Sequence, residues 1–280
     1  MMTIPKKYSK DKAGSLQREV PMFEVKRVIL LGRKCGLGQA YSHLVEQGIT
    51  VPILVVMDDN AVVREMAERH GTRVLTDDAE LYRLIEQGDD LVSDIDLVIS
   101  WLFPKRIKEP LFKLGRLGCL NLHPAPLPDY KSRAGYNTAI LERRKEFGVS
   151  VHYIDSEQFD AGPIIDVLRW PIDPEHETVL TLESATQEKL LELFQATVAR
   201  FVSSEAIATT ANLGGLYLSA KQLEAAKEID LERDSLEEIN RKIRAFFFPP
   251  HAGAYIMVHG QKFTLVNQAI LDLLAKRLTH

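Results

Sequence analysis

The sequence is poor in cysteine and in long apolar runs, and each shortage excludes a class of protein. Cys35 and Cys119 are its only two cysteines, too few for a disulfide framework or a cysteine-rich metal cluster. No apolar stretch approaches the roughly 18 residues of a transmembrane helix. Residues 1–24 have no apolar core of the kind that export signals carry. The simplest expectation is a protein of the reducing cytoplasm that has no bound metal and does not enter a membrane.

The sequence also lacks a strong excess of charge of either sign. Lys and Arg number 35 against 39 Asp and Glu, and the formal net charge is −4. Broad electrostatic capture of tRNA or DNA needs a concentrated basic surface, which this balance does not favour. With 45% hydrophobic and 26% charged residues among 280, the composition is that of a globular chain with one large domain and a small one.

Apolar runs that end at Gly, Asp or Trp alternate with amphipathic stretches between residues 25 and 202. Alternation of this kind predicts an α/β fold, a Rossmann-like and mostly parallel sheet flanked by helices. The expected strands are 25–31, 52–57, 74–75, 96–101, 119–123, 149–154 and 164–171. The expected helices are 39–46, 61–70, 77–88, 110–117, 135–146 and 178–202.

The two ends of the chain differ from this pattern. Residues 1–24 are polar and lack periodicity, which predicts a loosely held N-terminal arm. Residues 208–215 are small or polar and end in glycine, a pattern typical of a boundary. We therefore expect a catalytic domain over 25–207 and a small C-terminal region over 208–280. That region should hold a helix at 235–245 and a β-hairpin made of 254–258 and 261–266.

Gly32, Gly36 and Gly38 follow the first expected strand and invite comparison with dinucleotide-binding loops. Their spacing does not match G-x-G-x-x-G, and Asp58 and Asp59 are the only acidic support for such a site. We interpret the glycines as positions of close helix–strand packing, or as a phosphate or substrate loop, and not as a nicotinamide site.

The segment 118–165 carries the chemistry. Asn121 and His123 are two residues apart, so on a strand they point to the same face, and Pro124 ends regular pairing. In open parallel sheets, ligands bind beyond the carboxyl ends of the strands. Asp160 lies in a turn before Gly162. An amide, an imidazole and a carboxylate are the groups needed for acyl transfer to an amine: a donor for an oxyanion, a proton carrier and its charged partner.

The ordered motifs in this segment resemble the folate-dependent formyltransferase family. They read Asn121-Leu122-His123-Pro124, then Leu127-Pro128-Asp129-Tyr130, Gly148-Val149-Ser150-Val151-His152 and Asp160-Ala161-Gly162-Pro163-Ile164. The resemblance implies that Asn121, His123 and Asp160 are catalytic and that 10-formyltetrahydrofolate is the formyl donor, with no metal. Ser132 stands where the family usually has glycine. For His152 two interpretations remain open: it lines the site, or it is a structural histidine whose hydrogen bonds are made within the fold.

The bulky loop after the strand at 96–101 is the expected folate site. In relatives the loop after this strand grips the pterin ring, so Phe103, Arg106 and Ile107 are pocket candidates by the resemblance. Phe159, beside Asp160, would close the other side. The alternative interpretation is that the bulky side chains of this loop only complete the hydrophobic core.

Aromatic residues on the acceptor side resemble the nucleotide-sugar branch of the family. Arg133 occupies the loop that reaches the amine-bearing substrate in relatives, Tyr136 resembles an aromatic residue of the sugar-acting branch, and Tyr217 is a further candidate. Phe246, Phe247 and Phe248 cannot all lie on one face of a helix, because neighbours are about 100° apart. We expect at least one of these three rings to be exposed or to face a ligand, where it could stack on a nucleobase. The alternative is a hydrophobic contact between the helix and the hairpin.

The resemblance implies an N-formyltransferase that acts on a UDP- or dTDP-linked amino-deoxysugar in the biosynthesis of lipopolysaccharide or another glycan. Its expected partners are the folate and the nucleotide sugar, without nucleic acid and with a homodimer as a possible assembly. One alternative is a methionyl-tRNA formyltransferase, although those enzymes add a larger, basic C-terminal barrel. Another alternative is a non-catalytic nucleotide-binding protein on the same scaffold.

Overall fold

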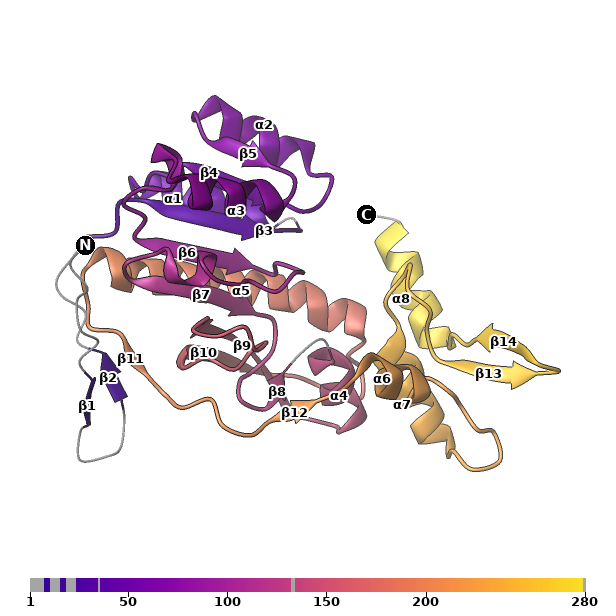
Figure 1. Ribbon diagram of the computed structural model, residues 1–280. Helices are drawn as coiled ribbons and strands as arrows, with labels where there is room; N and C mark the ends of the chain where they lie inside the picture. The colour runs from indigo at the N-terminus through magenta and orange to yellow at the C-terminus, as the bar shows by residue number, and fades with distance from the viewer. Residues whose placement is uncertain (1–7, 11–15, 19–23, 35, 132–133, 279–280) are drawn as a thin grey trace.

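The computed structural model describes residues 8–10, 16–18, 24–34, 36–131 and 134–278. Its centre is a seven-stranded sheet in the order β10-β9-β7-β6-β3-β4-β5 (Figure 1). The strands from β7 to β5 pair in parallel, whereas β9 and β10 are antiparallel. The bounds are β3 Val28–Gly32, β4 Ile53–Val56, β5 Arg73–Leu75, β6 Leu97–Trp101, β7 Gly118–His123, β9 Glu146–Tyr153 and β10 Ile164–Pro171. The Rossmann-like prediction is confirmed.

Helices cover both faces of this sheet because the parallel strands are apolar on both sides. One face packs on α1 (Gly36–Glu46), α2 (Ala61–Arg69) and α5 (Val179–Val202). The opposite face packs on α3 (Asp78–Gln87) and the short 3-10 helix η2 (Leu111–Lys113). Successive strand residues alternate between the two layers: Leu120 faces the α5 layer and Cys119 the α3 layer. Asn121 and His123 therefore share the α3 side with Cys119.

Trp101 explains the glycines of the first loop. A Cβ on Gly32 would lie 2.5 Å from the Trp101 carbonyl oxygen, and a Cβ on Gly36 would lie 2.5 Å from the Trp101 ring. Any side chain at either position would therefore collide with the end of β6. The interpretation of these glycines as close helix–strand packing agrees with this geometry.

Several expected elements, three helices among them, have different bounds in the structure. The helix predicted over 135–146 ends early: α4 is Gly135–Leu141, and Glu146 already begins β9. Arg143 has φ 55°, a left-handed turn that cannot continue a helix. The helix predicted over 110–117 shrinks to η2, because the chain must turn where Gly115 contacts the backbone of Gly118. The helix predicted over 39–46 begins earlier, at Gly36.

The N-terminal segment is not wholly irregular. β1 (Tyr8–Lys10) and β2 (Leu16–Arg18) form a small antiparallel sheet with β11 (Ala208–Thr209), which lies just after the catalytic domain. The two strands of the expected arm therefore form one sheet with the segment that leads to the C-terminal region, through the pairing of β2 with β11.

The C-terminal region packs on the α/β region that holds the seven-stranded sheet. It contains β12 (Leu216–Tyr217), α6 (Ala220–Ala225), α7 (Leu236–Phe246), the hairpin β13 (Tyr255–Val258) and β14 (Gln261–Thr264), and α8 (Gln268–Leu278). β12 pairs in parallel with β8 (Tyr130–Lys131) of the catalytic domain. Ile243 and Phe246 of α7 join Phe147 and Leu182 in one buried cluster. The two regions thus share a hydrophobic core.

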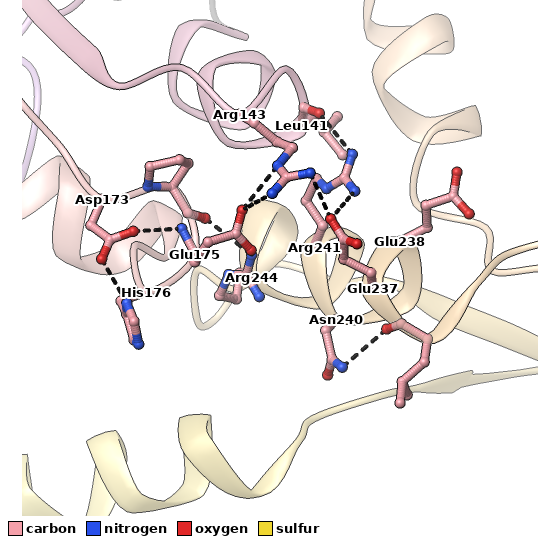
Figure 2. A network of polar contacts seen from close by, with 12 residues as sticks. Leu141, Arg143, Asp173, Glu175, His176, Glu237, Glu238, Asn240, Arg241 and Arg244 are labelled. Atoms are coloured by element: carbon pink, nitrogen blue, oxygen red, sulfur yellow. Dashed lines mark hydrogen bonds and ion pairs between the residues drawn. The ribbon is translucent and has the colours of Figure 1, made fainter.

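A network of arginines and carboxylates connects α7 with the segment that follows α4 and with the loop before α5 (Figure 2). Arg143, after α4, lies 3.0 Å from Glu175 and 2.8 Å from Glu237 of α7. Arg244 of α7 donates to the carbonyl of Pro174 at 3.0 Å and lies 3.4 Å from Glu175. The network links α7 to the loop before α5, so the segment that follows α7 has a defined place.

Candidate active site

The candidate site lies at the carboxyl end of β7, on the face of the sheet that α3 covers. Asn121 pairs with Ser100 on β6 and with His152 on β9, so the three residues form one row across neighbouring strands. His123, two residues on, is only 4% exposed. The expectation that Asn121 and His123 share a face agrees with the strand geometry.

Both ring nitrogens of His123 have partners. Nε2 lies 2.9 Å from the carbonyl oxygen of Tyr130, and because a carbonyl only accepts, Nε2 donates. Nδ1 lies 3.2 Å from Asp160 Oδ1. Burial lowers the pKa of His123, but the charge and hydrogen bond of Asp160, together with the Tyr130 carbonyl, outweigh it and raise the pKa above its ordinary value. Nδ1 is therefore the nitrogen at which the proton comes and goes.

Asp160 is held by its loop in an uncommon conformation. Its φ is 49°, in the left-handed region. The side chain of Asn212 donates to the Asp160 carbonyl at 2.8 Å and to the Gly162 carbonyl at 3.0 Å. Gly162 itself lies against the backbone of Tyr153, where a Cβ would come within 1.9 Å of the carbonyl oxygen. The turn that returns the carboxylate to His123 thus depends on a glycine and on an asparagine from beyond the catalytic domain.

The charge of Asp160 is stabilised chiefly by the His123 imidazole. Burial raises the pKa of Asp160, yet the charge and hydrogen bond of the neighbouring His123 outweigh it and hold the pKa far below its ordinary value. His152 Nε2 lies 3.6 Å from Asp160 Oδ1. The carboxylate therefore remains charged across the physiological range and favours the imidazolium form of His123.

A pocket opens beside these groups, and its lining includes all four residues expected to hold the folate. Phe103, Arg106, Ile107 and Phe159 line it with Asn121, and further lining residues are Ser100, Lys105, His152, Ile154, Ser156, Glu157, Gln158 and Asp160. The guanidinium of Arg106 lies over the Phe159 ring, 5.1 Å from its centroid. Apolar and cationic groups side by side suit a flat heterocycle that carries an anionic tail, which is the chemistry of a folate.

His123 is not among the described residues that line this pocket; it lies behind them, in contact with Asp160. Ser100 and His152 do line it. The sequence analysis left His152 undecided and did not single out Ser100, whose only signal was a lone hydroxyl inside an apolar strand. The register of β6, β7 and β9 brings both residues beside Asn121.

The residues expected on the acceptor side have varied environments. Arg133 lies outside the described residues. Tyr136, on α4, packs on Phe147 with ring centroids 5.5 Å apart, and burial raises its pKa. Tyr217 is 59% exposed on β12, beside Tyr130 and Lys131 of β8.

The three phenylalanines at the end of α7 have separate roles in packing. Phe246 and Phe247 belong to the buried cluster shared with the catalytic domain. Phe248 is only partly buried. Its ring stacks on His251, with centroids 5.5 Å apart and planes 15° apart, and Lys34 Nζ lies 5.9 Å from its centroid. Of the three rings, Phe248 is the one with a face near charged and polar groups.

In the part of the chain that the structure describes, no group of three His, Cys, Asp or Glu side chains is placed to hold a metal ion. Over the same residues, no helix combines the length and the apolar character needed to cross a bilayer.

The chain matches the family model described as formyl transferase over residues 27–198. Among curated relatives, the methionyl-tRNA formyltransferase of Halalkalibacterium halodurans is 29% identical over 179 residues, which cover 58% of this chain and 54% of the relative. The GDP-perosamine N-formyltransferase of Brucella melitensis is 29% identical over 170 residues, 61% of this chain and 64% of the relative. The chain thus spans about half the length of the tRNA-modifying relative.

Solved structures share the fold. A 4-N formyltransferase from Francisella tularensis superposes with a TM-score of 0.68 at 18% identity, over 86% of this chain and 97% of that one. An N-formyltransferase from Helicobacter canadensis, solved with folinic acid and dTDP-3-aminofucose, gives 0.64 at 21% identity, over 87% and 89%. The similarity to these two structures extends into the C-terminal region, beyond the segment that the family model covers.

Proposed function

The chain belongs to the formyl transferase family, and on that premise we propose that it moves a formyl group from 10-formyltetrahydrofolate to the amine of a nucleotide-linked amino sugar. The observation that carries the proposal is the convergence of Asn121, His123 and Asp160 beside the pocket at the end of β7. These three groups match the needs of acyl transfer in type and in placement.

The chemistry assigns one task to each side chain. The amine nitrogen forms a bond to the formyl carbon while the bond from that carbon to the folate nitrogen breaks. Asn121 donates a hydrogen bond to the carbonyl oxygen as negative charge develops on it. His123 accepts the proton that the amine loses, at Nδ1, and returns it to the departing folate nitrogen. Asp160 stabilises the imidazolium that forms between these two steps.

The folate would occupy the pocket lined by Phe103, Arg106, Ile107 and Phe159. Its flat ring suits Ile107 and Phe103, and its carboxylates suit Arg106. The bound folate supplies the formyl group. The protein supplies the hydrogen-bond donor, the proton carrier and a pocket from which water is partly excluded.

A nucleotide sugar is favoured as acceptor by the C-terminal region. Phe248 is partly buried at the junction of the two regions, where its ring could stack on a nucleobase. The relatives named GDP-perosamine N-formyltransferase and the neighbour solved with dTDP-3-aminofucose support an amino sugar on a nucleoside diphosphate. UDP and dTDP are the carriers we propose.

Methionyl-tRNA is the second candidate, because the relative from Halalkalibacterium halodurans is named for that activity. The net charge of −4 speaks against it, since tRNA binding needs a basic surface.

The test is a panel of UDP-, dTDP- and GDP-linked amino sugars, each incubated with 10-formyltetrahydrofolate and assayed for tetrahydrofolate release and for the formylated sugar. Charged initiator tRNA is included as a further acceptor. Turnover with one amino-sugar nucleotide supports the proposal. Formylation of the tRNA alone, or nucleotide binding without turnover, contradicts it in favour of the second candidate or of a non-catalytic protein.

A further inference from the structure

The carboxamide of Asn121 must point in one of two directions, and only one of them is useful for catalysis. An amide can rotate by about 180° and exchange its oxygen and nitrogen with little change of shape. With the nitrogen towards the reacting carbonyl, Asn121 can stabilise negative charge; with the oxygen there, it repels that charge. Something must therefore hold the amide in place.

Two buried neighbours in the same cross-strand row contact this amide. Ser100 Oγ donates to Asn121 Oδ1 at 2.8 Å, and Asn121 Nδ2 lies 3.0 Å from His152 Nε2. Ser100 and His152 are each 2% exposed. Among the residues that the structure describes, the second amide hydrogen has only a long contact, 3.4 Å, to Asp160 Oδ1. One hydrogen is thus fully engaged, and the other lies at the pocket.

His152 discriminates between the two orientations because its own tautomer is set by the backbone. Its Nδ1 lies 2.8 Å from the carbonyl oxygen of Tyr153, and since a carbonyl only accepts, Nδ1 carries the hydrogen. In the neutral ring Nε2 is then an acceptor, which suits the Asn121 nitrogen and repels the Asn121 oxygen. Ser100 is less selective, because a hydroxyl can rotate and either donate or accept.

We propose that His152 is a positioning residue: it fixes the Asn121 amide with one N–H facing the pocket, and Ser100 supports it from the neighbouring strand. The Tyr153 carbonyl fixes the tautomer of His152, and this tautomer in turn fixes the orientation of the Asn121 amide. The proposal rests on the proposed function for its kinetic consequence, whereas the orientation of the amide is a property of the protein alone.

Two conservative variants separate the role of each ring nitrogen. His152→Gln can present an acceptor at the place of Nε2, so kcat should stay within about fivefold of wild type. His152→Asn can still donate to Tyr153 but leaves Asn121 without its acceptor. Its kcat should fall about 10- to 100-fold, below the roughly 10²–10³ cost of losing an oxyanion donor outright. KM for either substrate should change little. Equal losses in the two variants would overturn the proposal.

A double-mutant cycle tests whether His152 acts through Asn121. If it does, His152→Asn should cost almost nothing further once Asn121→Ala has removed the amide. A loss as large in that background as in wild type would show that His152 acts elsewhere, for example through Asp160. Ser100→Ala should lower kcat less than His152→Asn.

A matched control accounts for the loss of a buried hydrogen bond as such. Thr72 is also buried, and its hydroxyl lies 2.7 Å from both the Val51 carbonyl and the Tyr41 hydroxyl near the far edge of the sheet. Thr72→Val should lower stability while leaving kcat unchanged. If Thr72→Val lowers kcat as His152→Asn does, the effect is global and the proposal fails.

Nuclear magnetic resonance gives a readout that does not depend on activity. The nitrogen–nitrogen coupling across the hydrogen bond from Asn121 Nδ2 to His152 Nε2 should be present in wild type and absent in His152→Asn. Its absence in wild type would overturn the positioning role even in an active enzyme. Its presence in a protein that transfers no formyl group would leave the positioning intact and refute only the proposed function.

Discussion

His123 Nδ1 and Asp160 Oδ1 lie 3.2 Å apart, although one residue ends a strand of the sheet and the other belongs to a distant loop. This contact raises the pKa of the imidazole and lowers that of the carboxyl. Both the rate and the stability of the protein should therefore depend on pH through this pair.

The rate should rise with pH through a midpoint above the ordinary histidine value of 6.5, because a general base must be neutral before it accepts a proton. Asp160→Asn removes the charge that favours the imidazolium, so the midpoint should move to lower pH and the maximal rate should fall. A pH–rate profile of kcat/KM for both proteins measures this. An unchanged midpoint and height would show that Asp160 is only structural.

Stability should respond to pH with two opposite signs. The raised pKa of His123 contributes stability that is fully present below about 6.5 and is lost as pH rises through the folded-state value. The depressed pKa of Asp160 contributes stability that is present above 3.8 and is lost as pH falls. The Tm difference between wild type and Asp160→Asn should thus be largest between about pH 4 and 6.5. A difference that is constant from pH 4 to 9 would contradict the pairing.

Asn121→Ala and His123→Ala should abolish most turnover while leaving the folate pocket largely intact. Loss of an oxyanion donor costs about 10²–10³ in rate, and loss of a general base about 10²–10⁴. Steady-state kinetics and folate binding to the purified variants check both parts. Near wild-type activity in either variant would refute the assignment.

Phe248 should matter for the nucleotide, and Phe246 for the fold. Phe248→Ala should raise KM for the sugar nucleotide about five- to more than a hundredfold, the equivalent of roughly 1–3 kcal/mol of stacking, with folate affinity unchanged. Phe246→Ala is the matched control, because that ring is buried: it should lower the free energy of unfolding by about 3–5 kcal/mol. If both variants lose stability and neither changes KM selectively, the three phenylalanines only pack in the core and the base binds elsewhere.

Binding to tRNA should be negligible at physiological salt, because the chain carries a net charge of −4. Filter binding or fluorescence anisotropy with charged initiator tRNA, at salt concentrations up to physiological, measures it. Sub-micromolar affinity that persists at physiological salt would favour the tRNA-modifying alternative.

The sequence predicts the sheet well, since its buried parallel strands are apolar runs. It fails at residues 142–146, where helical spacing continues although Arg143 turns the chain into β9. Asn121 and His123 could be placed together from the two-residue period of a strand.

The rest of the site depends on facts that the sequence does not contain. Ser100, Asn121 and His152 meet only because three strands pair in one register, and a lone serine in an apolar strand gives no sign of that. The contact between Asp160 and Asn212 joins two loops that no local pattern relates. The spacing of the three phenylalanines shows that they cannot all lie on one face of a helix, but it does not show which ring lies outside the core.

The bond from Asn212 to the Asp160 loop bears on how chimeras of this protein should be designed. Composition places the boundary at 208–215, yet Asn212 supports the catalytic loop and β12 pairs with β8. An exchange of C-terminal regions that cuts at residue 208 would remove this support. A graft joined after Tyr217 would retain it, and it would also have to preserve the α7 residues that share a buried cluster with Phe147 and Leu182.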